Sequence, residues 1–404
     1  MNILENKKII LGVSSGIAIY KAVDLSSKLR KLKVDLNIVL TEDAKKMISP
    51  VVFSAVGNCA VYSDYFNEVK DGWIPHTQLS MQSDALIIAP ATANIIAKIA
   101  NGFADDLLSL IALAFRKEAK ILVPTMNTRM YESPALQRNL EILKKDGWII
   151  VEPEIGHLAC GEIGKGRYPE NKMILEFLEY SLTKKDMKGK NVLITAGPTI
   201  EPIDPVRNIT NRSSGKMGYE LARSFSYRGA NVVLISGPTS VNPPYILKKF
   251  ISVKTADEMR NAVMKYYQNS DIIIMTAAVS DFKVKNYSDV KIKKDSGEIT
   301  LQLIKNPDIL KELGEVKKES QLLIGFAAET NNLLDYAKKK LIEKNCDIII
   351  ANDVSKKDIG FDSDLNETYI INKMGDVTHV EKSTKKDIAF RIIDYISNSG
   401  FIKA

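Results

Sequence analysis

The chain has 404 residues, of which 45% are hydrophobic and 26% are charged. At about 150 residues per domain this predicts roughly two to three folded domains, and it excludes a single small module and a disordered chain. The 56 Lys and Arg residues against 49 Asp and Glu give a formal charge of +7, an excess too modest to indicate nucleic-acid binding but suited to small anionic ligands.

Cysteine usage and hydropathy disfavour further classes of protein. Cys59, Cys160 and Cys346 include no CxxC pair, which favours a protein of the reducing cytoplasm over a disulfide scaffold. No segment approaches the ~18 uncharged apolar residues that a membrane helix needs. The apolar run after Lys7 and Lys8 is broken by glycine and serine, so it indicates a strand followed by a helix, not an export signal. We expect neither a membrane nor a nucleic-acid partner.

Short apolar runs alternate with helix-period segments along the whole chain. The predicted strands form two series, 8–13, 36–40, 85–89 and 121–123, and then 191–195, 231–235, 271–275, 322–326 and 347–351. This alternation is typical of α/β folds with doubly wound parallel sheets. A helical pattern at 172–182 is followed by a Lys-rich stretch without periodicity, which predicts a linker and two α/β domains, 1–186 and 187–404.

Each series opens with a strand followed by a turn of small residues, GVSSG at 12–16 and TAGPT at 195–199. Ligands of open parallel sheets lie beyond the carboxyl ends of the strands, where backbone N–H groups favour phosphate. Glycine and serine between a strand and a helix more often form just a tight connection. Neither turn matches GxGxxG, and Gly215-Lys216 is not a P-loop because Met217 follows.

Four features of the first half are candidates for chemistry. His76 lies in a predicted Gly- and Pro-containing loop, as a surface residue or a general base. The small residues 91–94 either pack a helix closely or admit a flat ring. Asn127 either caps a helix or binds a carboxylate or amide. Cys160 lies in the glycine-rich segment HLACGEIGKGRYPE, which predicts a mobile lid that carries either an active-site thiol or a bystander.

Five motifs in order, GVSSGIAIYKA, the histidine at 76, APATANIIAKIANG, PTMNTRMY and ACGEIGKGR, resemble the flavin-dependent cysteine decarboxylases, including phosphopantothenoylcysteine decarboxylase and relatives that process peptide C-terminal cysteines. The resemblance implies a trimeric, flavodoxin-like domain that binds FMN. In that family His76 is the base, Asn127 holds the substrate carboxylate and Cys160 is the acid on a closing flap. The motif around Asn127 often ends in Trp, whereas here it ends in Tyr131. The expected FMN contacts are Gly12, Ser14, Ser15, Thr41, Ala91, Thr92, Asn94 and Asp106.

The implied reaction explains why a redox group is needed. A cysteine carboxylate does not lose CO₂ readily, because the resulting carbanion has nowhere to delocalise. Oxidation of the carbon that bears the thiol gives a β-thiocarbonyl acid, which releases CO₂ as an enethiolate. Protonation and reduction then give the saturated thiol, so no external electron donor is consumed.

The second half carries a long polar segment at 195–225 with Arg207, Asn211 and Ser213-Ser214-Gly215, which indicates either a binding loop or a long surface loop. Asp281, just past a predicted strand, could hold a ribose hydroxyl or simply start a helix. The lysines of KIKK at 291–294, of 338–340 and at 344 are compatible with a solvated face. KNPDIL at 305–310, GFAAET at 325–330 and IIANDV at 349–354 lie at predicted strand ends or helix starts.

This ordered set resembles bacterial phosphopantothenate–cysteine ligase over 190–400, and the two families occur fused in this order in coenzyme A biosynthesis. The resemblance implies CTP as co-substrate, an acyl-cytidylate stabilised by Asn211, Mg²⁺ on the triphosphate with unassigned ligands, and a dimeric ligase domain within a larger homo-oligomer. Arg207 is expected near phosphopantothenate, and Lys291 is expected to act in catalysis as well as in CTP binding. The expected CTP contacts are Ala277, Asp281, Lys291, Pro307, Asp308, Ile309, Leu310, Phe326, Lys340 and Lys344.

Two other functions compete with this interpretation. One is a flavin prenyltransferase-like or peptide-cysteine decarboxylase head joined to a general nucleotide-binding domain, which SSGKMG, KIKK and GFAAET disfavour. The other is a regulatory binding protein on a decayed decarboxylase fold. It predicts loss of the acid–base set, whereas His76, Asn127 and Cys160 are all present.

Overall fold

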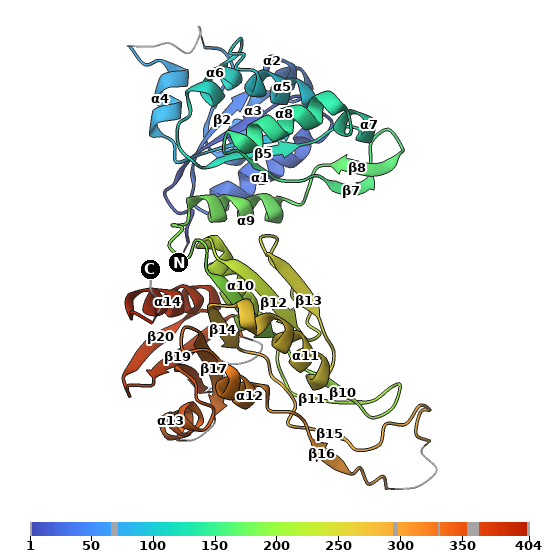
Figure 1. Ribbon diagram of the computed structural model, residues 1–404. Coiled ribbons are helices and arrows are strands. Elements are labelled where there is room, and N and C mark those ends of the chain that lie inside the picture. The colour runs from blue at the N-terminus through green and yellow to red at the C-terminus, as the bar shows by residue number, and fades with distance from the viewer. Residues whose placement is uncertain (1, 66–71, 294–297, 330–331, 354–362, 402–404) are drawn as a thin grey trace. The chain divides into compact units, whose positions relative to one another are not determined.

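The computed structural model describes residues 2–65, 72–293, 298–329, 332–353 and 363–401. The chain divides into two compact units, 2–183 and 184–404 (Figure 1). The division falls inside the Lys-rich stretch, three residues before the predicted boundary at 186. Each unit is described by itself below.

The first unit is built on a parallel sheet of six strands in the order 3-2-1-4-5-6. The four strands predicted from apolar runs are present, each at its predicted position or one to two residues longer, and the doubly wound α/β fold is confirmed. The order reverses between the first and fourth strands, and ligands of such sheets bind in the crevice at that point. The strands are β1 (Lys8–Val13), β2 (Asp35–Leu40), β3 (Ala60–Tyr62), β4 (Ala85–Ala91), β5 (Lys120–Pro124) and β6 (Ile149–Ile150).

Helices cover both faces of this sheet because successive strand residues point to opposite sides. In β1, Ile9, Leu11 and Val13 belong to one core, and Ile10 belongs to the other. The first core is covered by α1 (Ile19–Lys31), α2 (Glu42–Met47), α3 (Pro50–Gly57) and α9 (Asn171–Leu182). The second is covered by α4 (Pro75–Gln82), α5 (Ala93–Ala100), α6 (Leu107–Ala114), the short α7 (Thr128–Tyr131) and α8 (Pro134–Lys145).

One local prediction for the first unit was wrong. His76 lies in the first turn of α4, not in a loop, because Pro75 occupies the first helical position, where its fixed φ favours a helix start. The glycine-rich segment at 157–170 is partly regular. It contributes to an antiparallel hairpin, β7 (Glu154–His157) and β8 (Ile163–Arg167), whose connecting turn carries Cys160. We call residues 154–167 the flap.

The second unit repeats the order 3-2-1-4-5-6 and then adds two strands that sequence analysis did not predict. The added strands, β19 and β20, run antiparallel, so this sheet is mixed at one edge. The strands in spatial order are β13 (Lys249–Ser252), β12 (Asn231–Ser236), β9 (Asn191–Ala196), β14 (Ile272–Met275), β17 (Leu322–Glu329), β18 (Ile348–Asp353), β19 (Leu365–Asn372) and β20 (Val377–Thr384).

Helices also flank this sheet on both faces. One core contains α10 (Lys216–Tyr227) and α14 (Lys385–Asn398). The other contains α11 (Ala256–Tyr266), which runs into a 3₁₀ turn (Tyr267–Asn269), α12 (Ile309–Val316) and α13 (Leu333–Glu343). Among the described residues, no helix is long and apolar enough to cross a membrane.

Two β-ribbons, which we call the arms, project from the second sheet (Figure 1). They are β10 (Ile200–Pro202) with β11 (Asn208–Thr210), and β15 (Phe282–Val284) with β16 (Leu303–Lys305). Large apolar side chains are exposed along the arms and the loops they carry, namely Val206, Phe282, Tyr287, Val290, Ile299, Leu301, Leu303 and Ile304.

Candidate functional site

In the first unit, a cavity of about 820 Å³ opens at the carboxyl ends of β1, β4 and β5 and beside the flap. Its size lies within the range of small-molecule sites. It brings together three of the predicted residues, Thr92, Asn127 and Cys160.

Asn127 and Cys160 are in direct contact although 33 positions separate them. Asn127 caps α7, with its side-chain oxygen accepting from the Arg129 backbone N–H at 2.8 Å. Its Nδ2 is thereby directed to the flap and donates to Cys160 Sγ at 3.2 Å and to Glu162 Oε2 at 3.3 Å. Asn127 is therefore a helix cap, as one interpretation expected, and it also lines the cavity.

The flap approaches this segment closely. The Met126 N–H donates to the Gly166 carbonyl at 3.0 Å, and Arg129 pairs with Glu162 at 3.0 Å. A Cβ at Gly166 would lie 2.1 Å from the Met126 carbonyl oxygen, and Gly166 has φ +144°, so only glycine allows this approach.

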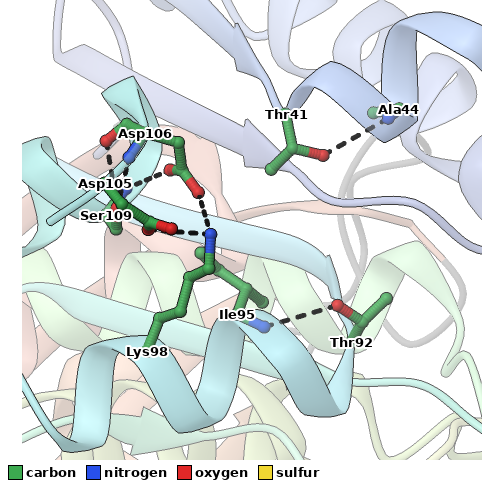
Figure 2. A network of polar contacts seen from close by, with 8 residues as sticks. All are labelled: Thr41, Ala44, Thr92, Ile95, Lys98, Asp105, Asp106 and Ser109. Carbon is green, nitrogen blue, oxygen red and sulfur yellow. Dashed lines mark hydrogen bonds and ion pairs between the residues drawn. The ribbon is translucent and has the colours of Figure 1, made fainter. Parts of the chain in front are cut away.

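Ser14 joins the loops after β1 and β4. It is buried, its hydroxyl donates to the Pro90 carbonyl at 2.8 Å, and its Oγ accepts from the Thr92 N–H at 2.9 Å. Thr92 in turn caps α5 (Figure 2), so the helix begins at a residue that lines the cavity. Helix N-termini of this kind favour anions.

Other residues predicted to contact a flavin have structural roles here. Thr41 caps α2, and Asp106 caps α6 while pairing with Lys98 at 2.8 Å, as Figure 2 shows. Gly12 is packed in the core, since a Cβ there would lie 2.4 Å from Leu108 Cδ1. The predicted residues outside the lining of this cavity, all within the described ranges, are Gly12, Ser14, Ser15, Thr41, His76, Ala91, Asn94 and Asp106.

His76 is not brought to the cavity that holds Asn127 and Cys160. It lies half-buried in α4, and its Nδ1 is buried without a hydrogen-bond partner. A buried ring nitrogen without a hydrogen bond costs free energy, so we expect a ligand or another chain to supply a hydrogen-bond partner.

Sequence analysis missed several residues that line this cavity. Lys21 and Arg167 supply positive charge, and Met126 and Met130 supply apolar walls. Lys21 donates to the Tyr168 carbonyl at 3.1 Å, and burial, followed by the nearby Arg167, lowers its pKa. Lys21 lies in the quoted motif GVSSGIAIYKA, and Arg167 lies in ACGEIGKGR. Their position as cations near a phosphate-compatible turn is the signal that could have identified them.

In the second unit, two adjoining cavities lie beyond the carboxyl ends of the strands next to the switch between β9 and β14. The first, of about 490 Å³, is lined by the start of α10 and by Asn211. The second, of about 590 Å³, contains every predicted CTP contact except Lys291. The cavities share Ala277, Val279, Asp281, Phe326 and Lys340.

The start of α10 is packed tightly onto the strand ends. A Cβ at Gly218 would lie 2.4 Å from Thr276 Oγ1 and 2.6 Å from Ala196 Cβ, so only glycine allows the helix to approach. Asn211 Nδ2 donates to the Val279 carbonyl at 3.0 Å, which fixes the loop over the same crevice.

Cationic side chains border the second cavity. Lys340 donates to the Phe326 carbonyl at 2.8 Å, and Lys344 pairs with Asp308, which caps α12. The hydrogen bond from Lys344 helps to lower the pKa of Asp308 against the opposing effect of burial. Asn352, which belongs to the quoted segment IIANDV, lines the cavity of about 490 Å³ together with the missed residues Asn366 and Lys385, which lie on or beside the unpredicted strands β19 and β20.

Arg207 and Lys291 lie outside both cavities. Arg207 pairs with the buried Asp204 at 2.9 Å and donates to the carbonyl of Ile292, the neighbour of Lys291, so both belong to the arms. Among the described residues, no group of three or more His, Cys, Asp and Glu side chains could hold a metal ion. The last positions of three quoted motifs, 294, 330 and 354, lie outside the described ranges.

Comparison with known proteins agrees with this division. Residues 2–183 match the family model "Flavoprotein", and residues 187–399 match "DNA/pantothenate metabolism flavoprotein C-terminal domain". The chain is 46% identical to the coenzyme A biosynthesis bifunctional protein CoaBC of Bacillus subtilis, over 98% of this chain and 97% of that protein. It is 42% identical to the CoaBC of Escherichia coli K12, over 92% of each chain.

Two solved structures are also similar. The C-terminal domain of a CoaBC protein is 44% identical, covering 53% of this chain and 97% of that chain with a TM-score of 0.46. The FMN-dependent cysteine decarboxylase SpaF is 30% identical, covering 44% and 98% with a TM-score of 0.39. From the family models and the full-length relatives, the chain belongs to the family of bifunctional coenzyme A biosynthesis proteins, with a flavoprotein decarboxylase half and a ligase half.

Proposed function

We propose that the second unit joins cysteine to 4'-phosphopantothenate with CTP, and that the first unit decarboxylates the product to 4'-phosphopantetheine with FMN. The observation that carries the proposal is the contact of Asn127 with Cys160 at a cavity bordered by Thr92, within a chain that matches the bifunctional family over nearly its whole length.

The cavity of the first unit, of about 820 Å³, fits FMN in size and in the kind of residues that line it. Ile17, Met126 and Met130 offer apolar walls for a flat ring, whereas Lys21, Arg167 and the start of α5 offer positive charge for a phosphate. When bound, FMN supplies reversible oxidation and reduction at the carbon that bears the substrate thiol. Thr92, which Ser14 positions, would hold it at the strand ends, with Gly12, Thr41 and Asp106 shaping the loops around it.

The chain's own residues would then handle the carboxylate and the protons. The Asn127 amide, fixed by its cap at Arg129, donates to the substrate carboxylate and holds it beside the flap. Cys160 donates a proton to the enethiolate carbon after CO₂ departs, because its thiol lies 3.2 Å from the same amide. His76 takes the proton of the substrate thiol, and the closed flap limits the access of water.

In the second unit the two cavities suit two parts of one reaction. The CTP nucleoside occupies the cavity of Asp281, Phe326 and residues 307–310, with Asp281 on the ribose. Lys340 and Lys344 would neutralise phosphate charge, and Mg²⁺ would be held mainly by phosphate oxygens and water. Asn211, in the adjoining cavity, stabilises the acyl-cytidylate until the cysteine amine displaces CMP.

We propose further that the chain forms a homo-oligomer, with trimeric first units and dimeric second units. His76 lies outside the cavity that needs a base, and Arg207 and Lys291 lie outside the cavities that need cations. The arms that carry the last two residues also expose large apolar side chains, which favours pairing with a second copy. In such an assembly a neighbouring copy supplies the missing groups. Cys160 can act as an acid only as a reduced thiol, which favours a location in the reducing cytoplasm.

One assay tests both activities. Purified protein with bound flavin is mixed with phosphopantothenate, cysteine and CTP, while CO₂ and pyrophosphate are followed. We expect both products. Pyrophosphate without CO₂ would refute the decarboxylase assignment, CO₂ only from supplied phosphopantothenoylcysteine would refute the ligase assignment, and neither product would favour the regulatory binding protein.

Subunit complementation tests the shared sites. Lys291→Gln and Asn211→Ala are each expected to abolish ligation, and mixed assemblies of the two variants are expected to recover part of it, because one site per dimer then keeps both residues. Mixed assemblies as inactive as the single variants would show that each chain completes its own site.

A further inference from the structure

Three residues outside the predicted catalytic and binding set together connect the flap to the helix behind Asn127. The Tyr131 hydroxyl donates to Glu152 Oε2 at 2.6 Å, and the Lys165 ammonium lies 2.7 Å from the same oxygen. The Lys165 ammonium also lies 5.1 Å from the centre of the Tyr131 ring. Glu152 is therefore the common acceptor between α7 and strand β8 of the flap.

We propose that Tyr131, Glu152 and Lys165 form a latch that holds the base of the flap against α7 and so sets the reach of Cys160 to Asn127. The proposal rests on the decarboxylase function proposed above. Asn127 and Cys160 touch the substrate, whereas the three latch residues are positioning residues.

The backbone makes the connection from latch to site short. The Tyr131 N–H donates to the Asn127 carbonyl at 2.9 Å, so a shift of the tyrosine moves the residue that holds the carboxylate. On the flap, Lys165 precedes Gly166, whose carbonyl accepts from Met126. The latch thus fixes the backbone contacts of both Asn127 and Gly166 at the base of the flap. The position of the flap tip, which carries Cys160, depends on these contacts.

The protonation states suit a permanent latch at neutral pH. Burial, and then the hydrogen bond to Glu152, raise the pKa of Tyr131, so the phenol remains a donor. Burial disfavours the charged form of Glu152, but the hydrogen bonds from Lys165 and Tyr131 outweigh it and lower the pKa of the carboxyl. The Tyr131 side chain itself is 5% exposed, so its ring is a fixed point for the flap.

The experiment measures amide hydrogen exchange of the peptide 154–167 in the full-length protein, together with CO₂ release from supplied phosphopantothenoylcysteine. Tyr131→Phe keeps the ring and removes the hydroxyl, and Lys165→Met keeps the stem and removes the charge. Each is expected to speed exchange of the flap roughly tenfold, the effect of losing one hydrogen bond to a charged group. Each should lower kcat more than it changes KM, because Cys160 acts after the substrate is bound.

Lys144→Met is the matched control. Lys144 lies 3.9 Å from Glu152 Oε1 but pairs with Glu141 at 2.9 Å on its own helix and touches no flap residue. It should leave flap exchange unchanged. The double variant Tyr131→Phe/Lys165→Met should exchange no faster than the single variants, because all break one link through Glu152.

The results of this experiment distinguish a failure of the latch proposal from a failure of the decarboxylase assignment. Flap exchange at the wild-type rate in Lys165→Met, a partly exposed position where misfolding is not expected, would overturn the latch, and so would additive effects in the double variant. If the wild-type protein released no CO₂ while exchange still responded to both variants, the latch would stand and the decarboxylase assignment would fall.

Discussion

Gly12→Ala tests whether the first phosphate-compatible turn is glycine-rich for packing. The added Cβ would lie 2.4 Å from Leu108 Cδ1, 3.2 Å from Leu108 Cδ2 and 3.3 Å from Ile88 Cγ1. Carbon atoms prefer separations of about 3.5–4.0 Å, so Leu108 must move by about 1 Å. Leu108 is 1% exposed and Ile88 is fully buried, so little space is free for that movement.

Overpacking of this kind costs about 1–3 kcal/mol. In a unit of about 180 residues, 2 kcal/mol lowers Tm by roughly 4–8 °C. The assay is thermal unfolding followed by tryptophan fluorescence. Both tryptophans of the chain, Trp73 and Trp148, lie in the first unit, so the signal reports on that unit and not on the ligase half.

Leu108→Ala provides the control. By itself it should cost about 2–5 kcal/mol, because it leaves a cavity. Combined with Gly12→Ala it should cost at least about 1 kcal/mol less than the sum, because the new methyl group enters the space that Leu108 leaves. Strict additivity of the two changes, or a Gly12→Ala protein with an unaltered Tm, would refute the packing argument.

Three further predictions concern the other sites. Lys340→Met should raise KM for CTP roughly 10- to 100-fold, the loss of one charge-assisted contact, with CO₂ release from supplied phosphopantothenoylcysteine unaffected; an unchanged KM would remove Lys340 from the CTP site. Iodoacetamide at pH 8 should label Cys160 first in a peptide map, because burial raises the pKa of Cys59 to about 11 and of Cys346 to about 12 and so suppresses their thiolates. Equal labelling of all three thiols would contradict this order of reactivity. Because the pKa values of Cys59 and Cys346 are raised in the folded protein, the stability that their protonated thiols contribute is complete below the unfolded thiol pKa of about 8.5. It is lost as the pH rises toward 11 and 12. Leu303→Asp, on an arm, should shift the assembly to a smaller mass by light scattering, whereas Val316→Asp, exposed on α12, should not; identical masses would argue against pairing through the arms.

The central parallel strands could be predicted from the sequence because they are buried on both faces and read as uninterrupted apolar runs, whereas the short, more exposed parallel strands β3, β6 and β13 were missed. β1 and β9 show this well, since each begins at its predicted residue. The antiparallel edge strand β20 could not, because most of its residues are exposed and its composition is polar. The flap hairpin was missed for a related reason, since the glycines that let β8 approach residues 126–128 carry no hydrophobic pattern.

The candidate site could be predicted only where family resemblance supplied what spacing cannot. Nothing in periodicity places Cys160 beside Asn127, because their contact depends on how the flap folds back over α7. Periodicity also cannot predict the position of Lys291. It lies between predicted strands in the sequence, and in the structure it lies on an arm, beside Ile292, whose carbonyl accepts from Arg207. The error at His76 was avoidable, since Pro75 before a polar–apolar pattern is a helix-start signal.

Both units use one strand order, and this accounts for where their sites lie. With the order 3-2-1-4-5-6, the connections after the first and fourth strands leave in opposite directions, so the loops after β1 and β4, and after β9 and β14, part to form a crevice. The scaffold fixes that position but not its chemistry. In the first unit the crevice is walled by methionines and by the flap, which suits a flat ring. In the second it is walled by the start of α10, Asp281 and lysines, which suits a nucleoside triphosphate. It follows that exchanging loops between the units, with the sheets kept, should carry much of the ligand preference with the loops, because many of the residues that line the cavities lie in loops and at helix starts.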